Sequence, residues 1–352
     1  MLIDKILGIF SQDVGIDLGT ANTLVYVKGK GIVIRESSVV AINQKTKKIL
    51  AIGDEAKKMV GRTPAYIIAH RPLVDGVVSD FEITEQMLRY FIEKVHRDTF
   101  TIFPRPKVVI GIPYGVTEVE RRAVDEAAIN AGAREVYLIE EPIAAALGAR
   151  LPINEPTANM IVDIGGGTTD IAIISIGGAV TSKSLKIAGD KFNSDIIKFI
   201  RDEFNLLIGE PTAEEIKISI GSAAPLDERL ELAVRGRDVT SGLPKEAIIK
   251  SHQIRTALSR SLRLILDAIR ETIENSPPEL AGDILKRGIY LCGGGAMIKG
   301  IDELIKKEIN VNTIIVDDPL TCVVRGAGIA AENIEEYSQF FNTPLKPMDI
   351  SL

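Results

Sequence analysis

Short apolar runs alternate along the chain with longer segments in which apolar residues recur at helical spacing. This alternation predicts an α/β fold. The runs rich in β-branched residues, which we expect to be strands, are 14–17, 22–27, 107–112 and 135–139. Two helical stripes are expected to face the core: Met87, Leu88, Phe91, Ile92 and Val95, and Ile254, Leu258, Leu262, Ile265, Ile269 and Ile273.

Two helix starts carry local signals. Thr117 and Glu120 form the pattern of a capping box, which opens a helix predicted to end at Ala131. A second helix is predicted over 142–149, because proline is favoured at the first helical position. Both helices follow predicted strands, so the alternation continues through this part of the chain.

The first strand pair has a counterpart in the second half of the chain. Asp17 closes the first strand and is followed by a glycine turn, a threonine and a second strand. Asp163, 146 positions later, is followed by Gly165-Gly166-Gly167-Thr168 and another strand. Two copies of one strand–Asp–glycine–Thr–strand unit imply two related halves.

Each of these turns has the composition of a phosphate-binding loop. Glycines let backbone N–H groups approach a ligand closely, and the threonine hydroxyl adds a donor. A bare carboxylate would repel phosphate, so the role that suits Asp17 and Asp163 is to hold a hydrated Mg²⁺ that bridges the phosphates. One such turn alone is also typical of a β-hairpin without a ligand, whereas two in corresponding positions favour a binding site.

A third glycine turn follows a predicted strand at 289–291. It is Cys292-Gly293-Gly294-Gly295-Ala296, and it opens a predicted helix with Met297, Ile298, Ile301, Leu304 and Ile305. Such a turn brings the backbone close to a ligand. The chain contains neither GxGxxG nor GxxxxGK followed by Ser or Thr, which excludes the dinucleotide-binding and P-loop folds. The remaining interpretation is a nucleotide held between the two halves of the chain.

Glu140 and Glu141 precede Pro142 at a strand-to-helix junction. Negative charge suits a helix N-terminus, so at least one of the two is expected to act as an ordinary capping acid. A carboxylate that reaches the γ-phosphate would instead orient or deprotonate the attacking water. Glu141, next to the proline, is the residue to which we assign that role.

Composition excludes several classes of protein. At 352 residues the chain is long enough for two cores, and its net charge of -6 argues against a general nucleic-acid coat. Cys292 and Cys322 lack CxxC spacing and suit a reducing compartment, with a disulfide between them left open. The scattered histidines, which do not predict a zinc site, are His70, His96 and His252.

The length of the apolar segments indicates whether the chain could cross a membrane. The longest, Met160 to Val180, is interrupted by Asp163 and Asp170, so no membrane-spanning helix is predicted. Nothing in the sequence resembles a cleavable signal peptide. We therefore expect a cytoplasmic protein.

Residues 1–10 form a candidate amphipathic helix. Its apolar face would consist of Leu2, Ile3, Ile6, Leu7 and Phe10. A membrane anchor is one interpretation, and a helix docked on its own domain is the other. One Lys balances one Asp in this segment, so attraction to lipid would be mainly hydrophobic. A single copy binds weakly, whereas a filament presents many copies.

Five segments resemble, in order, the signature of the actin/sugar-kinase/heat-shock-chaperone ATPase superfamily. They are Asp17-Leu-Gly-Thr-Ala-Asn-Thr, Glu140-Glu-Pro-Ile-Ala-Ala-Ala, Asp163-Ile-Gly-Gly-Gly-Thr-Thr, Leu291-Cys-Gly-Gly-Gly-Ala and Asp318-Pro-Leu. Within this superfamily the chain resembles the bacterial actins of the MreB family over nearly its full length. Further stretches with this narrower likeness are 61–64, 71–78 and 117–124. A single motif is shared widely, but the combination is specific.

The resemblance implies which residues hold a nucleotide. The phosphates would lie between two groups, Thr20, Ala21 and Asn22 on one side and Gly166, Gly167 and Thr168 on the other. The adenosine side would be formed by Glu214, Glu215, Ile216 and Lys217, on a helix opened by Thr212-x-x-Glu215, and by Gly294, Gly295, Ala296 and Met297.

The resemblance also implies chemical roles. Asp17 and Asp163 would organise Mg²⁺, and Glu141 would position water. Asp170 stands where many MreB sequences have Glu. Because Asp170 lies past the phosphate turn, we expect this departure to matter little.

The implied architecture is an actin-like ATPase fold. Two related halves, each a mixed sheet flanked by helices, would enclose a nucleotide cleft and carry smaller inserted subdomains. We expect a membrane-binding segment, a first half with an insertion, a second half with an insertion, and a C-terminal helix that returns to the first half and ends in a tail. Their ranges are 1–10, 11–148 with about 33–78, 149–318 with about 182–246, and 319–352. Residues 221–246, charged and dotted with glycine, are expected to be an exposed excursion outside the core.

The implied function is that of a polymerising bacterial actin with slow ATPase activity. It would bind ATP or ADP with Mg²⁺, lie peripherally on the inner face of the cell membrane, and organise cell-wall elongation and rod shape. Its partners would be itself in a filament, membrane lipid through residues 1–10, the adaptor RodZ and cell-wall elongation proteins, with no nucleic acid. A chaperone-type ATPase and a small-metabolite kinase on the same fold stay as alternatives.

Overall fold

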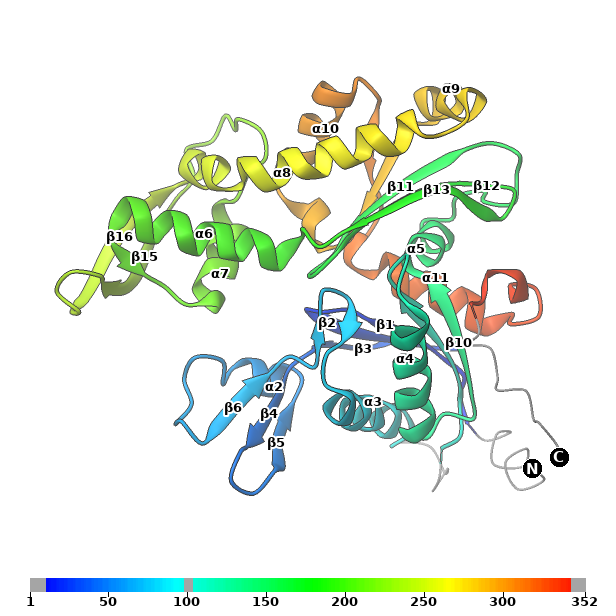
Figure 1. Ribbon diagram of the computed structural model, residues 1–352, viewed down its shortest axis with the longest axis horizontal. Coiled ribbons are helices and arrows are strands. Elements are labelled where there is room, and N and C mark those ends of the chain that lie inside the picture. The colour runs from blue at the N-terminus through cyan, green and yellow to red at the C-terminus, as the bar shows by residue number, and fades with distance from the viewer. Residues whose placement is uncertain (1–10, 98–103, 343–352) are drawn as a thin grey trace.

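A computed structural model of the protein shows two halves, one above the other, joined through helices α5 (Glu141–Gly148) and α11 (Cys322–Glu332) (Figure 1). The structure describes residues 11–97 and 104–342. The helix expected over residues 1–10 lies outside these ranges and stays a prediction.

The sheet of the first half has five strands, in the order β10 (Glu135–Glu140), β9 (Lys107–Ile112), β1 (Val14–Leu18), β2 (Asn22–Val27) and β3 (Gly31–Ser37). β1 pairs antiparallel with β2 and parallel with β9. The helices α3 (Phe81–His96) and α4 (Glu118–Asn130) pack on this sheet through a shared apolar cluster. The predicted stripe supplies its α3 residues, and Met87, Leu88 and Phe91 are fully buried.

The sheet of the second half repeats this arrangement. Its order is β13 (Gly178–Leu185), β12 (Thr169–Ser175), β11 (Asn159–Ile164), β17 (Ile289–Cys292) and β18 (Thr313–Ile315). β11 pairs antiparallel with β12 and parallel with β17, as β1 does with β2 and β9. The predicted repeat of one strand unit in two related halves is therefore confirmed.

Five helices accompany the second sheet. They are α6 (Gly189–Phe204), α7 (Glu210–Ile220), α8 (Ser251–Glu274), α9 (Pro278–Arg287) and α10 (Ile301–Ile309). The predicted stripe of α8 lies in the core of this half, where Ile254, Leu258 and Ile269 are fully buried. Each half thus has a hydrophobic core of its own, as the chain length predicts.

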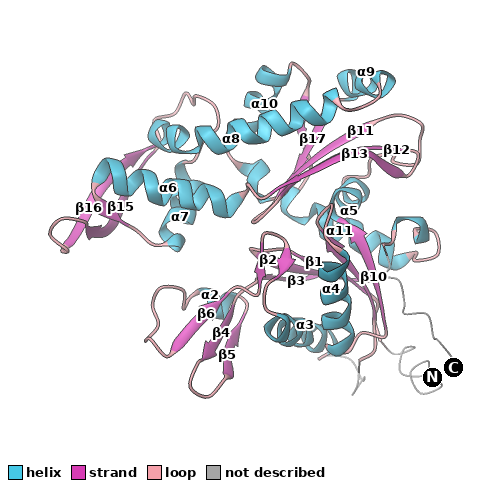
Figure 2. Cartoon of the chain, in the orientation of Figure 1, coloured by secondary structure: helices cyan, strands magenta, loops and turns pink. Residues whose placement is uncertain are grey.

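Two small sheets project from the halves toward the same side (Figure 2). The one on the first half contains β4 (Val40–Asn43), β5 (Lys48–Ile52) and β6 (Ile67–His70), next to the short helix α2 (Asp54–Lys57). The one on the second half contains β14 (Leu206–Leu207), β15 (Glu231–Asp238) and β16 (Pro244–Lys250). A hairpin of β7 (Leu73–Val74) and β8 (Val77–Val78) follows β6.

The second small sheet adds to the expectation for residues 221–246. Most of this segment is exposed or half-buried and its hairpin projects from the second half, as expected (Figure 2), but β15 and β16 pair antiparallel along their length. Val234 of β15 and Ile249 of β16 are buried in the core of the second half. The other residues of the two strands are exposed or half-buried, so composition alone does not show which positions face the core.

Helix starts agree with the sequence in one case and differ in two. The capping box of α4 is present, with the Thr117 hydroxyl accepting from the Glu120 N–H. α7 begins at Glu210 with Pro211 in its first turn, so it is not opened by Thr212. The third glycine turn leads only into a short 3-10 helix (Gly294–Met297), because Gly300 adopts a left-handed conformation before α10 begins.

The helices α5 and α11 touch backbone to backbone between the two large sheets. A Cβ atom at Gly326 would lie 1.7 Å from the carbonyl oxygen of Ala144, and one at Gly148 would lie 1.9 Å from that of Cys322. Side chains of both helices share one apolar cluster with strands of both halves. Cys292 and Cys322 belong to this cluster as free, buried thiols.

We predict that Gly326→Ala destabilises the protein. The added methyl group meets backbone atoms, which cannot move aside as a side chain can, so overpacking should lower the free energy of unfolding by about 1–3 kcal/mol or more. Chemical denaturation measures the change. Gly282→Ala is the matched control, because its Cβ atom on α9 meets nothing within 4 Å and alanine favours a helix by about 1 kcal/mol. Equal losses in the two variants would contradict the close contact.

Candidate functional site

The two predicted phosphate turns face each other in direct contact. The first joins β1 to β2 and the second joins β11 to β12. A Cβ atom at Gly166 would lie 2.7 Å from the Cβ atom of Ala21, and one at Gly167 would lie 2.6 Å from the hydroxyl oxygen of Thr20. Glycine is therefore required at both positions by close approach, and backbone N–H groups of both halves meet at one place.

The β7–β8 hairpin closes one side of this contact. Asp75 and Gly76 at its tip have φ values of 51° and 77°, and the Gly76 N–H donates to the Thr20 hydroxyl at 2.8 Å. A Cβ atom at Gly76 would lie 3.2 Å from a methyl carbon of Thr168. Since the Thr20 oxygen accepts this bond, its O–H is left to donate to a ligand.

Four carboxyl groups gather beside the turns. Asp163, Asp170 and Glu141 are 5%, 1% and 9% exposed, and Asp17 is partly exposed. Burial raises the pKa of Asp17 to about 7. Burial, and after it the charges of the other three carboxylates, raise the pKa of Glu141 well above its usual value. The pKa values of Asp163 and Asp170 are raised in the same direction, with burial as the largest cause.

This donor set suits a hydrated divalent cation. Like charges that share a site with little water disfavour the ionised form, and a nearby cation reverses that effect. Oxygen ligands are those that Mg²⁺ prefers, and it usually keeps several of its water molecules. Among the described residues, no three or more His, Cys, Asp or Glu are grouped closely enough to ligate a metal directly. The role expected of Asp17 and Asp163, to hold a hydrated Mg²⁺, is compatible with this arrangement and stays a prediction.

Glu140 and Glu141 have different surroundings. Glu140 precedes α5 without any capping bond from its side chain, and its carboxylate accepts from the amide of Asn342 at 2.9 Å. The expectation that one of the pair acts as a capping acid is therefore not met by a capping hydrogen bond. Glu141 lies near the other carboxyl groups, whose charges act on it, and it packs beside Gly111 of β9.

Asp170 is a member of the site that the sequence analysis set aside. It lies opposite Asp163 in the β11–β12 pair, and its carboxylate accepts from the Tyr114 N–H at 3.1 Å. The expectation that Asp in place of Glu matters little here stays a prediction, but after burial the charge of Asp170 is the first of the charges that raise the pKa of Glu141. The four-residue turn between β11 and β12 held the signal, since hairpin register alone places Asp170 across from Asp163.

Of the α7 residues predicted to contact the adenosine, Glu214 to Lys217, only some have side chains that a ligand could reach. On α7, the Lys217 amine donates to the Gly189 carbonyl at 3.0 Å, and Glu214 lies 3.4 Å from Lys57. Burial lowers the pKa of Lys217. Glu215 is exposed. The side chain of Ile216 is fully buried in the core of the second half, so its side chain is withdrawn from the site.

The third glycine turn abuts the acidic cluster. A Cβ atom at Gly293 would lie 2.3 Å from a carboxylate oxygen of Asp163, and one at Gly295 would lie 2.2 Å from the Ile164 side chain. Gly294 and Met297 are exposed, whereas Gly295 and Ala296 are buried. Of the four residues predicted to cover the base and sugar, Gly294 and Met297 therefore offer an accessible surface.

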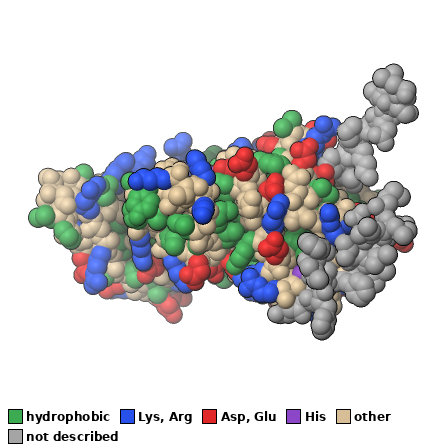
Figure 3. Space-filling model, turned by 90° about the horizontal axis from the view of Figure 1, so that it is seen from below, with side chains coloured by type: hydrophobic (Ala, Val, Ile, Leu, Met, Phe, Trp, Pro, Cys, Tyr) green, Lys and Arg blue, Asp and Glu red, His purple; other side chains and the backbone are tan. Residues whose placement is uncertain are grey.

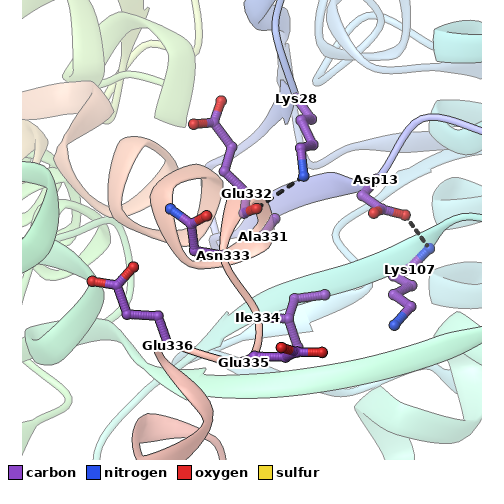
Figure 4. Close-up of a pocket in the computed structure, with 9 residues that line it drawn as sticks. All are labelled: Asp13, Lys28, Lys107, Ala331, Glu332, Asn333, Ile334, Glu335 and Glu336. Atoms are coloured by element: carbon purple, nitrogen blue, oxygen red, sulfur yellow. Dashed lines mark hydrogen bonds between the residues drawn. The ribbon is translucent and has the colours of Figure 1, made fainter.

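A cavity of about 440 Å³ lies at the other end of the first sheet (Figure 4). Its lining includes Asp13, directly before β1, Lys107 at the start of β9, and Glu332 at the end of α11. The Lys28 amine donates to the Glu332 carbonyl there at 2.9 Å. Since Asp17 and the phosphate turn lie at the opposite end of β1, this cavity does not belong to the site.

The fold and the paired turns define an actin-like ATPase fold, in which two related halves enclose a nucleotide cleft. Solved structures agree. MreB5 of Spiroplasma citri, solved with ADP, has a TM-score of 0.89 and 43% identity, covering 94% of this chain and 98% of that one. A MamK double helical filament, at 24% identity and a TM-score of 0.78, shares the fold over 92% of this chain and 99% of that one.

Sequence comparison assigns the chain to one family within this fold class. The family model described as MreB/Mbl protein matches residues 11–339, and the chain belongs to this family. It is 51% identical to the cell shape-determining protein MreB of Escherichia coli K12 over 338 residues, covering 95% of this chain and 97% of that protein. It is 48% identical to the cell shape-determining protein Mbl of Bacillus subtilis over 327 residues, covering 93% and 98%.

We predict that Asp17 makes the stability of the ligand-free protein depend on pH. The folded chain raises the pKa of this carboxyl from 3.8 to about 7, so folding favours the protonated form. The stabilisation is complete below the pKa of the unfolded chain, 3.8, and is lost as the pH rises toward the pKa of the folded chain, about 7. Asp17→Asn cannot ionise, so between pH 5 and 8 it should gain about 2–3 kcal/mol relative to the native chain, at roughly 1.4 kcal/mol per pH unit.

Urea unfolding without nucleotide or divalent cation measures this difference. Asp227→Asn, at an exposed aspartate of the second half, is the matched control and should follow the native chain at every pH. A pH profile for Asp17→Asn that matches this control would show that burial does not act on Asp17.

Proposed function

We propose that this chain is an ATP-binding, slowly ATP-hydrolysing bacterial actin whose filaments organise cell-wall elongation and maintain rod shape. The observation that carries the proposal is the direct contact of two glycine turns beside four buried or partly buried carboxyl groups. The family supports it, since similar proteins are named cell shape-determining. The filament of MamK supports self-association on this fold.

The proposed binding mode uses both halves. Thr20, Ala21 and Asn22 hold the phosphates from the first half, and Gly166, Gly167 and Thr168 hold them from the second. Glu214 and Lys217, together with Gly294 and Met297, border the adenosine. The solved MreB5 structures, which contain ADP or AMPPNP, support a nucleotide in this cleft. Mg²⁺, when bound, neutralises charge on the phosphate oxygens.

Glu141 is the proposed acceptor for the proton of the attacking water. Its carboxyl group is buried next to the turns, and this burial, followed by the charges of its neighbours, raises its pKa. The ionised form of a carboxyl group with a raised pKa is a stronger base than an ordinary carboxylate. Asp170 acts on this residue by charge rather than by touching the water, so we propose it as a positioning residue.

We predict that Glu141→Gln keeps ATP affinity but lowers the rate of phosphate release by roughly 10²-fold or more, the usual scale for a positioned base. Amide and carboxylate have nearly the same size, so binding should survive. Phosphate release and calorimetric binding of Mg-ATP measure the two properties. Glu140→Gln is the matched control, because Glu140 bonds Asn342 instead and should keep its turnover.

Sedimentation of the native chain with ATP separates the function classes. A pellet that depends on ATP supports the filament, whereas phosphorylation of an added sugar without a pellet would support a small-metabolite kinase. Unchanged phosphate release in Glu141→Gln would remove this residue from the mechanism while leaving the binding site in place.

Residues 1–10 are proposed to bind the filament to the inner face of the membrane. The described part of the chain contains no helix long and apolar enough to cross a bilayer. Full burial of the five apolar side chains would contribute several kcal/mol, at about 1.5–3 kcal/mol each before the cost of ordering. Many copies along one filament would then bind together. RodZ and the cell-wall elongation proteins are proposed as partners on the family resemblance alone.

We predict that deleting residues 1–10 abolishes co-sedimentation with neutral phosphatidylcholine vesicles in the presence of ATP but leaves polymerisation intact. The paired substitutions Ile6→Glu and Phe10→Glu should act like the deletion. Lys5→Gln, on the polar face, is the matched control and should keep binding, since the attraction is hydrophobic. A truncated chain that stays on vesicles would place the anchor elsewhere, and one that unfolds would identify a docked helix.

A further inference from the structure

Arg71 joins the two halves through ion pairs with residues of two helices. It lies between β6 and the β7–β8 hairpin of the first half, and its guanidinium group contacts two acids of the second half. One terminal nitrogen lies 3.0 Å from a carboxylate oxygen of Asp190, and the other lies 2.5 Å from one of Glu210. The Arg71 side chain is only 25% exposed, so these pairs are screened less than ordinary surface pairs.

The two acids belong to different helices. Asp190 lies in the first turn of α6, and Glu210 begins α7. A planar guanidinium group presents its donors in a fixed fork, so one arginine can hold both carboxylates in a way that the single ammonium of lysine does not reproduce. Arg71 therefore fixes the first half against both helices at once.

One of these helices is tied directly to the second phosphate turn. The Asp190 N–H donates to the Gly166 carbonyl at 2.8 Å, and the Gly189 N–H donates to that of Gly165 at 3.2 Å. Because of these hydrogen bonds, a change in the contact between Arg71 and Asp190 would be transmitted through α6 to the turn proposed to hold the phosphates. The hairpin that follows Arg71 reaches the same place from the other side, where Gly76 bonds Thr20.

We propose that Arg71 is a positioning residue that latches the two halves over bound nucleotide and sets how long the nucleotide stays. This inference rests on the proposed nucleotide site and adds to it the contact that controls closure. Opening the cleft separates Arg71 from Asp190 and Glu210 and leaves two carboxylates side by side without their cation. Loss of a partly buried, hydrogen-bonded charge pair acts mainly on the rate of dissociation.

The test is the release rate of a fluorescent ADP analogue from the full chain with Mg²⁺, chased with unlabelled ATP below the polymerising concentration. Arg71→Ala should release the analogue about tenfold faster, and Arg71→Lys should be intermediate because lysine cannot fork. Arg235→Ala is the matched control. It removes an arginine–glutamate pair of 2.6 Å that lies wholly within the β15–β16 hairpin, and it should release like the native chain.

Two further readouts separate a latch from a general structural role. Added salt should speed release from the native chain more than from Arg71→Ala, because the screened pairs are absent from the variant. Asp190→Asn combined with Arg71→Ala should release no faster than Arg71→Ala alone, since contacting residues are coupled in a double-mutant cycle. Additive rates, or a release rate for Arg71→Ala equal to that of the native chain, would overturn the latch.

Two other outcomes of these experiments would also test the latch. If Arg71→Ala does not fold, Asp190→Asn with Glu210→Gln carries the test from the other side, and native-like release from that variant overturns the latch. If the native chain does not bind the ADP analogue at all, the proposed nucleotide site fails and the latch fails with it. If the native chain binds the analogue normally but Arg71→Ala and Asp190→Asn with Glu210→Gln both release it at the native rate, the latch is rejected and the proposed nucleotide site stands.

Discussion

Everything in this fold depends on two helices that pass each other without side chains between them. Gly148 and Gly326 allow α5 and α11 to approach until backbone meets backbone. Because both helices share one apolar cluster with strands of each half, their separation sets the distance between the two sheets. The ends of β1 and β11 then fall opposite each other, and the turns that follow them touch. A wider crossing would part the turns and open the site.

That geometry concentrates negative charge where the fold can least tolerate it. Asp163 and Asp170 face each other across one strand pair, and Asp17 and Glu141 approach from the first half. Burial raises the pKa of all four, which shows that the folded chain holds them at a cost to its own stability. A cation held between these groups would favour their ionised forms, which supports the proposed Mg²⁺ site.

Sequence reasoning succeeded where the signal was local and failed where it was not. Both glycine turns, the capping box of α4 and the core stripes of α3 and α8 depend on residues close together in the chain. The strands β15 and β16 were not predicted, because each buries a single residue, Val234 or Ile249, and their sequences lack a regular alternation of apolar and polar positions. Asp170 was set aside although the turn length placed it opposite Asp163. The contacts of Arg71 join residues 119 or more positions apart, and no local pattern reveals them.

The cleft carries opposite electrostatics at its centre and at its mouth. At the centre, carboxylates of both halves repel one another. At the mouth, Lys57 and Arg71 of the first half meet Glu214, Asp190 and Glu210 of the second. Elsewhere, charges of both signs are mixed, as on the face in Figure 3. The outer pairs favour closure and the inner carboxylates oppose it. A divalent cation at the centre, where Asp17 and Asp163 are proposed to hold it, would lessen the repulsion and leave the attraction of the outer pairs, so the proposed closure would depend on what is bound between the halves.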